Sequence, residues 1–193
     1  MAESTTTTTA TIKADVVFSQ QQSFGGSASN IVMQGSTDYT VSLNSGSGKE
    51  VREIDSIFNV GNFIIASGET ESYDLSSLSQ SAFGSNYSIS LTGLKGLVIR
   101  NHATGVNEML TLKATGANAF TSIFNGGSGG PEGIKISPGG AYFYSDPYWG
   151  TPVTTSNKIL NLTNVGSGSG VNNYNTGLLV SIIIAGTSGT GGY

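Results

Sequence analysis

Apolar and polar residues alternate with a period of two along most of the chain, and a helical period is almost absent. Clear examples are Tyr39–Leu43, Tyr87–Leu91, Leu97–Ile99, Leu110–Leu112, Ile134–Ile136 and Leu160–Leu162. Such alternation is typical of β-strands in which one face points to a core and the other meets solvent or a partner. The pattern therefore predicts a protein built from strands.

Turn-forming segments rich in glycine, serine and asparagine separate these runs, and the chain contains 28 glycines. Runs and turns together predict about ten strands, which is typical of a sandwich or a barrel. We expect an all-β, jelly-roll-like antiparallel β-sandwich with essentially no helix. Helix is confined, at most, to a turn near Leu75–Ala82 and another near Asn118–Phe124.

The two ends of the chain are of low complexity, so we expect three segments. Residues 1–22 form an extended N-terminal arm, residues 23–186 a single β-sandwich domain, and residues 187–193 a C-terminal tail rich in glycine, serine and threonine. Polar segments of this kind fray when left alone. The arm is therefore expected to lie across a neighbouring subunit and to add strand pairing there.

The last apolar run, Leu178–Ala185, is apolar on both faces of the strand that it predicts. A strand of this kind is either central and covered on both sides, or it packs against another subunit. Under the second alternative, the candidate interface residues are Leu178, Leu179, Val180, Ile182, Ile183 and Ile184.

The segment Ile134–Pro147 has the sequence IKISPGGAYFYSDP. A phosphate-binding loop would need a following Lys-Ser/Thr and a helix, and neither is expected here. Proline presets φ at the second position of a turn, and glycine supplies the positive φ that the third position requires. We therefore predict that Ser137–Gly140 is the reversal between two antiparallel strands.

Four aromatic residues gather in and after this turn: Tyr142, Tyr144, Tyr148 and Trp149. Tyrosine and tryptophan are favoured at protein interfaces, which makes these residues candidates for packing or subunit contact. The alternative is sugar binding, for example to a host-surface glycan, because flat aromatic rings stack on sugars.

Charged residues make up only 10% of the chain, against about 25% in an ordinary globular domain. The 8 basic and 12 acidic residues are scattered, so no surface could neutralise a row of phosphates and no nucleic-acid partner is expected. The N-terminus has no signal-peptide pattern, and no apolar stretch is long enough to span a membrane as a helix. We expect no membrane partner.

The sequence offers little for catalysis or for metal binding, and we expect no enzyme activity and no cofactor. His102 is the only histidine and there is no cysteine, so neither a usual zinc site nor a Ser-His-Asp triad with a nucleophile elbow is expected. Acidic residues cluster at 50–55 and 69–74, where glycoside hydrolysis or an incidental cation is the alternative to ordinary solvated carboxylates.

Several segments together resemble a diffuse group of small all-β structural proteins encoded among the virion genes of tailed phages and prophages. The resemblance runs from about residue 46 to 186, and its most recognisable parts are DLSSL at 74–78, VIRN at 98–101 and PGGAYFY at 138–144. It implies a virion component and carries over no catalytic residues.

Together, these observations lead us to expect a non-enzymatic bacteriophage structural protein, a capsid or capsid-decorating subunit made in the host cytoplasm and located in the virion. Its partners would be itself, as a symmetric homo-oligomer such as a trimer, and other virion proteins. The alternative is a carbohydrate-binding tail or receptor-binding module.

Overall fold

The computed structural model describes residues 9–23, 30–46, 50–82, 85–124, 133–166 and 177–188, and within the first two of these ranges it describes side chains only for residues 9–13 and 40–46. This part of the chain is essentially all-β, with 14 strands and one 3-10 turn, η1 (Ser122–Phe124). The strands are β1 (Ala10–Ser23), β2 (Asn30–Ser45), β3 (Glu53–Ile54), β4 (Ser56–Ile65), β5 (Thr70–Asp74), β6 (Leu78–Ala82), β7 (Ser85–Ile89), β8 (Gly93–Asn101), β9 (Leu110–Lys113), β10 (Ile134–Ile136), β11 (Ala141–Ser145), β12 (Thr151–Pro152), β13 (Ile159–Asn164) and β14 (Leu178–Thr187).

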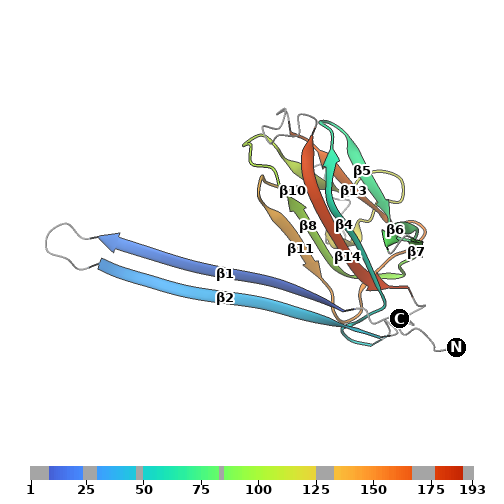
Figure 1. Cartoon of the computed structure of the whole chain (residues 1–193), viewed down its shortest axis with the longest axis horizontal. Helices are drawn as coiled ribbons and strands as arrows, with labels where there is room; N and C mark the ends of the chain where they lie inside the picture. Colours follow the sequence, from blue (N-terminus) through green and yellow to red (C-terminus); the bar gives the residue numbers. More distant parts are fainter. Residues whose placement is uncertain are drawn as a thin grey trace.

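Two open antiparallel sheets form the body of the protein, and they pack face to face (Figure 1). The sheet nearer the viewer, which we call the front sheet, has the order β11-β8-β14-β4, with β12 also paired to β8. The other, the back sheet, has the order β10-β9-β13-β5. The short hairpin β6–β7 stands beside them.

The long-range strand pairs follow a simple rule. Counted along the chain, the eight main strands of the two sheets are β4, β5, β8, β9, β10, β11, β13 and β14. The first pairs with the last, the second with the seventh, the third with the sixth and the fourth with the fifth, all antiparallel. These four pairs fall alternately in the front and the back sheet.

The main hydrophobic core lies between the two sheets, and the strands supply it with every second residue. In the front sheet, Leu97 and Ile99 of β8 and Val180, Ile182 and Ile184 of β14 are fully buried. Leu110 and Leu112 of β9 and Leu160 and Leu162 of β13 face them from the back sheet. The alternation seen in the sequence therefore marks the core, as period-two burial requires.

Strands β1 and β2 form a long hairpin, which we call the arm, that projects away from the two sheets (Figure 1). Its register runs from Ala10↔Leu43 to Ser23↔Asn30. The run Tyr39–Leu43 was expected within a sandwich domain that begins at residue 23, but it lies in β2 and pairs with β1. Residues 10–22 of the expected N-terminal arm pair with residues 31–43 of the same chain, while residues 1–8 lie outside the described residues. Pairing of the arm with a neighbouring subunit stays a prediction.

The turn at Ser137–Gly140 has the predicted geometry, since Gly139 has φ of 72° and the amide of Gly140 donates to the Ser137 carbonyl at 2.9 Å. However, β10 and β11, which it joins, lie in different sheets, so the turn is a corner between sheets and not a hairpin. Of the two expected helical turns, the second is present as η1. In the first, Leu78–Ala82 is strand β6, because it pairs with β7.

Within the described ranges, no helix is long and apolar enough to cross a membrane.

Candidate functional site

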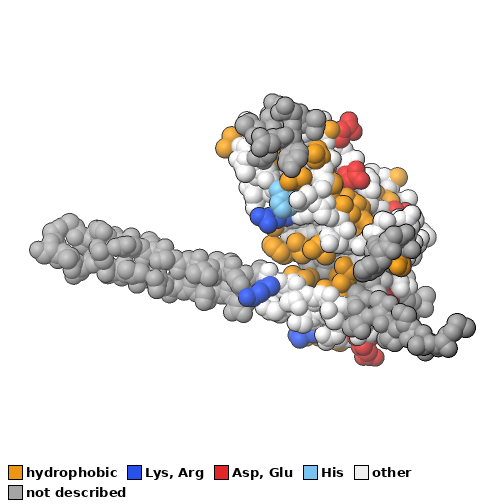
Figure 2. Space-filling view, viewed as in Figure 1, with side chains coloured by type: hydrophobic (Ala, Val, Ile, Leu, Met, Phe, Trp, Pro, Cys, Tyr) orange, Lys and Arg blue, Asp and Glu red, His pale blue; other side chains and the backbone are white. Residues whose placement is uncertain are grey.

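The outer face of the front sheet carries a row of apolar side chains that the core does not bury. Phe143 of β11, Val98 of β8 and Ile183 of β14 are register partners across three adjacent strands, and we call this row the outer strip. Phe143 is 47% exposed and Ile183 is 41% exposed, whereas Val98 is half-buried. Figure 2 shows hydrophobic side chains gathered across this face. Contiguous exposed apolar patches are one feature of protein contact surfaces.

The root of the arm covers the next row of the same face. Here Gly96 of β8 pairs with Ala185 of β14, and Ile12 and Leu43 of the arm lie over them. Together with Val41 and Ile54, these arm and sheet residues form a second hydrophobic cluster, separate from the main core. The absence of a side chain at Gly96 provides the room, since a Cβ there would lie 2.7 Å from Ile12 Cδ1. Among the arm side chains that the structure describes, those at the root are therefore packed against the front sheet.

The outer face of the back sheet is of the opposite character. Its matching row contains Lys135, Thr111, Thr163 and Thr70, which are partners across all four strands. The hydroxyls of Thr70 and Thr163 lie 2.7 Å apart and share a hydrogen bond. On the neighbouring row, Ser72 donates to Asn161 Oδ1 at 2.7 Å. Among the described residues, the outer face of the front sheet carries the row of apolar side chains, and the matching row of the back sheet is polar.

The candidate interface strand Leu178–Ile184 lies in β14, in the middle of the front sheet between β8 and β4. Leu178, Val180, Ile182 and Ile184 point into the core and are buried. Leu179 and Ile183 point to the outer face, where Leu179 is half-buried and Ile183 is exposed. Strand β14 is thus covered on its inner face by the core, and on its outer face it is fully covered at the Ala185 end, where the root of the arm lies over it.

The four candidate aromatic residues differ in their burial. Tyr142 and Tyr144 pair with Ile99 and Leu97 of β8 and pack against the main core, where burial raises the pKa of both phenols. The hydroxyl of Tyr144 is hydrogen-bonded to that of Thr151. Tyr148 and Trp149, by contrast, lie on the following loop and are 55% and 73% exposed. Tyr148 and Trp149 are therefore the more exposed pair, and Tyr142 and Tyr144 are half-buried against the core.

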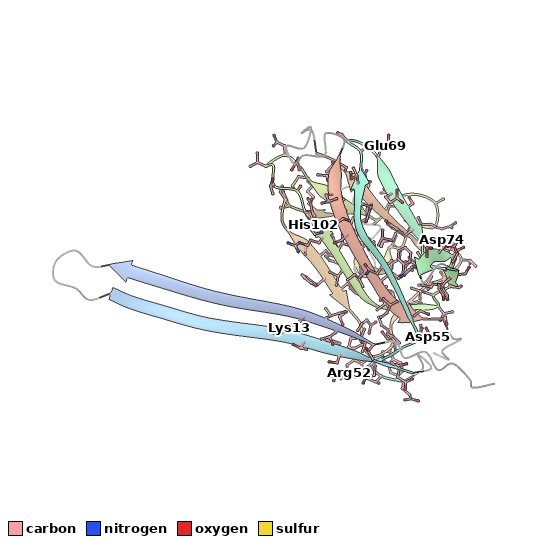
Figure 3. All side chains as sticks on the ribbon, viewed as in Figure 1. Lys13, Arg52, Asp55, Glu69, Asp74 and His102 are labelled. Atoms are coloured by element: carbon pink, nitrogen blue, oxygen red, sulfur yellow. The ribbon has the colours of Figure 1, made fainter. Side chains whose placement is uncertain are left out.

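Polar residues border the outer strip. His102 Nε2 lies 2.9 Å from Ser181 Oγ, a contact between the end of β8 and the outer face of β14 (Figure 3). Burial, and then the positive charge of Arg100, lower the pKa of His102 below its ordinary value. A Ser-His contact suits nucleophilic catalysis only when a carboxylate orients the histidine. In the described part of the chain no carboxylate is hydrogen-bonded to His102, so the contact does not make a triad.

The acidic residues expected near 50–55 gather around a buried lysine at the foot of the arm. Lys95 is 1% exposed, and its Nζ donates to the Glu50 carbonyl at 2.9 Å. Burial lowers the pKa of Lys95, while the nearby carboxylates of Glu53, Asp146, Asp55 and Glu50 partly oppose this effect. The four carboxylates thus partly compensate one buried cation, and the hydrogen bond from Lys95 holds the backbone at Glu50.

The second acidic cluster, near 69–74, is spread out in space (Figure 3). Glu69 is exposed, whereas Asp74 accepts a hydrogen bond from Lys158 Nζ at 2.7 Å and others from the backbone and hydroxyl of Ser76. Burial alone would raise the pKa of Asp74, but these hydrogen bonds outweigh it and lower the pKa. No group of three or more possible ligands for a metal ion is found among the described residues.

Sequence reasoning missed Phe143, Val98 and Gly96. The alternation in AYFYS does place Phe143 on the face opposite to Tyr142 and Tyr144, so a signal for it was present. That Phe143, Val98 and Ile183 form one row follows only from the register of three strands that are far apart in the chain. Nothing in the sequence distinguishes Gly96 from other glycines in strands, because its role depends on the arm residues that lie over it.

Comparison of the chain with family models, with curated proteins and with solved structures gave no match.

Proposed function

We propose that this chain is a non-enzymatic structural subunit of a bacteriophage virion, which forms the capsid or decorates it and works by packing against copies of itself and other virion proteins. The observation that carries the proposal is the combination of a projecting arm with an uncovered outer strip next to the seat of that arm. A two-stranded hairpin is marginally stable in water on its own, so an arm of this length is best explained by a partner that covers it.

Within this proposal, the fold is a jelly roll. A jelly roll contains eight strands in two antiparallel sheets, with two Greek keys. The pairing of first with last, second with seventh, third with sixth and fourth with fifth, alternately in the two sheets, supports this assignment. Jelly rolls are common in viral capsid proteins but also occur in lectins and cupins, so the fold supports the function only as an analogy.

The composition of the chain also supports assembly. Only 10% of residues are charged, and the outer strip contains none. Bringing such a surface into contact with a neighbour costs little desolvation of ionised groups.

The mass of the purified full-length protein tests this function. We expect closed shells or a discrete oligomer in electron micrographs and by light scattering, with shells indicating a capsid subunit and a small oligomer indicating decoration. A monomer at all concentrations up to those reached in a virion would contradict the proposal.

A second candidate is a carbohydrate-binding tail or receptor-binding module. It is favoured by the exposure of the adjacent rings of Tyr148 and Trp149, which could stack on a sugar. A glycan array with the native protein and Trp149→Ala separates the two candidates. Strong binding that is lost in Trp149→Ala supports the module, whereas no binding by either protein supports the structural subunit.

A further inference from the structure

One face of the arm carries more apolar residues than the other. In the described root, Ile12 and Val41 are buried while their neighbours Thr11, Lys13 and Thr40 are exposed. The register continues this alternation outward, because successive strand positions alternate between faces. The face that contains Ile12 and Val41 is formed by the even-numbered positions of β1 and the odd-numbered positions of β2. Beyond the root these are Ala14, Val16, Phe18, Gln20, Gln22, Ile31, Met33, Gly35, Thr37 and Tyr39.

The opposite face, formed by the odd-numbered positions of β1 and the even-numbered positions of β2, is mostly polar. It contains both aspartates of this stretch, Asp15 and Asp38, which are register partners, and only two apolar residues, Val17 and Val32. The apolar set thus continues beyond the root, into a part of the hairpin that projects away from the body (Figure 1). Its root already shows what this face binds, namely the outer face of the front sheet at Gly96 and Ala185.

We infer that the part of the arm beyond its root, residues 14–23 and 30–39, packs across the outer strip of a second copy of this chain, with its more apolar face against Phe143, Val98 and Ile183. This inference rests on the proposed structural role and names the two surfaces that carry it. It extends an interface that the chain already makes internally. The outer strip lies two residues along each strand from the arm seat, which is a step of about 7 Å on the same face.

The dimensions of the two surfaces agree. Residues 14–23 of an extended strand span about 33 Å, and the axes of four neighbouring strands span about 14 Å, so the arm can cross the whole front sheet. The arm of the same chain is held at its root and directed away from the body (Figure 1), so the outer strip that it covers belongs to another copy. The matching row on the back sheet is polar, and Thr111 and Thr163 within it are already buried, so that face is the poorer acceptor.

Cross-linking of the full-length protein tests this inference directly, because the chain has no cysteine and single cysteines can be introduced cleanly. A tagged Val16→Cys chain is mixed with an untagged Ile183→Cys chain and treated with a short bis-maleimide. We expect a cross-linked species that contains one of each chain. The matched control is Val17→Cys, because Val17 is the adjacent valine on the opposite face of the arm. This variant should give at least five-fold less cross-linked product.

Sedimentation of Ile183→Lys supplies the second measurement. The substitution places a charge on the outer strip without entering the core, and it should weaken self-association at least ten-fold. Val106→Lys changes a loop valine that is 88% exposed and lies off the strip, so it should not alter association. Equal cross-linking from positions 16 and 17, or unchanged association of Ile183→Lys, would overturn the inference. If the protein still forms an oligomer in that case, another surface forms it, and the proposed structural role is not affected. A native protein that never associates would remove both.

Discussion

Ile12 fills the space that the missing side chain of Gly96 leaves on the outer face of the front sheet. A Cβ at Gly96 would lie 2.7 Å from Ile12 Cδ1 and 3.5 Å from Leu43 Cδ1. This contact holds the root of the arm to the body of the protein. It also fixes the point at which the remainder of the arm leaves the front sheet.

Gly96→Val should disturb this seat. Ile12 and Leu43 would have to move away from the added methyl groups, and overpacking of this kind costs about 1–3 kcal/mol of unfolding free energy. Urea unfolding measures the loss. The control is Gly61→Val on β4, where a Cβ would meet nothing within 4 Å. If both variants unfold at the same urea concentration, the seat is not a tight contact.

Shortening the arm should separate folding from association. Lys13 and Thr40 are register partners, so residues 14–39 can be replaced by Asn-Gly, which favours a two-residue hairpin turn. The root keeps Ile12, Val41 and Leu43, and we expect a cooperative thermal transition near that of the native protein. Light scattering should show the monomer. A shortened protein that still assembles would show that other surfaces suffice.

Thr111→Val should stabilise the protein. The hydroxyl of Thr111 is buried and has no hydrogen-bond partner among the described residues. Removing an unpaired buried hydroxyl while keeping the side-chain shape should add about 1 kcal/mol. Its register partner Thr163 is the control, because Thr163→Val loses a hydrogen bond to Thr70 and should destabilise. Thermal denaturation of the two variants should therefore show shifts of opposite sign.

Asn101→Leu should be among the most damaging single substitutions. The buried amide donates to the carbonyls of Glu108 and Ile136 and accepts from the Ala103 amide. Leucine would leave these backbone groups without partners, at a cost of about 3 kcal/mol or more. Asn86→Leu on exposed β7 should cost far less. Comparable unfolding midpoints for the two variants would contradict this account.

The lowered pKa of Asp74 should make the free energy of unfolding depend on pH in the acidic range. Its pKa is lower in the folded than in the unfolded chain, so its contribution is present above the unfolded pKa, about 3.9, and is lost as the pH falls through the folded value. Relative to the native protein, Asp74→Asn should be about 1 kcal/mol less stable at pH 7, because the pair with Lys158 is partly exposed. This difference should vanish at low pH. Glu69→Gln, at an exposed position, is the matched control and should change the stability at pH 7 far less.

The local pattern of the sequence predicted the strand content well. The alternations at Leu97–Ile99, Leu110–Leu112 and Leu160–Leu162 are strands β8, β9 and β13, with their leucines and isoleucine in the core. The Pro138-Gly139 turn was predictable for the same reason, since a turn type is fixed by the φ preferences of two residues. Period and turn chemistry are properties of a few neighbouring residues, and a sequence displays them directly.

The candidate site depended on relationships that no local pattern contains. Alternation separates Phe143 from Tyr142 and Tyr144, but only pairing with β8 decides that the tyrosines face inward and Phe143 outward. Likewise, the sequence shows that β14 is apolar on both faces, while the position of the arm root decides that Ala185 is covered and Ile183 is not. The sequence by itself determined that the chain forms strands and which residues share a face. The tertiary structure decided which faces are buried, because burial is set by the register of strands far apart in the chain.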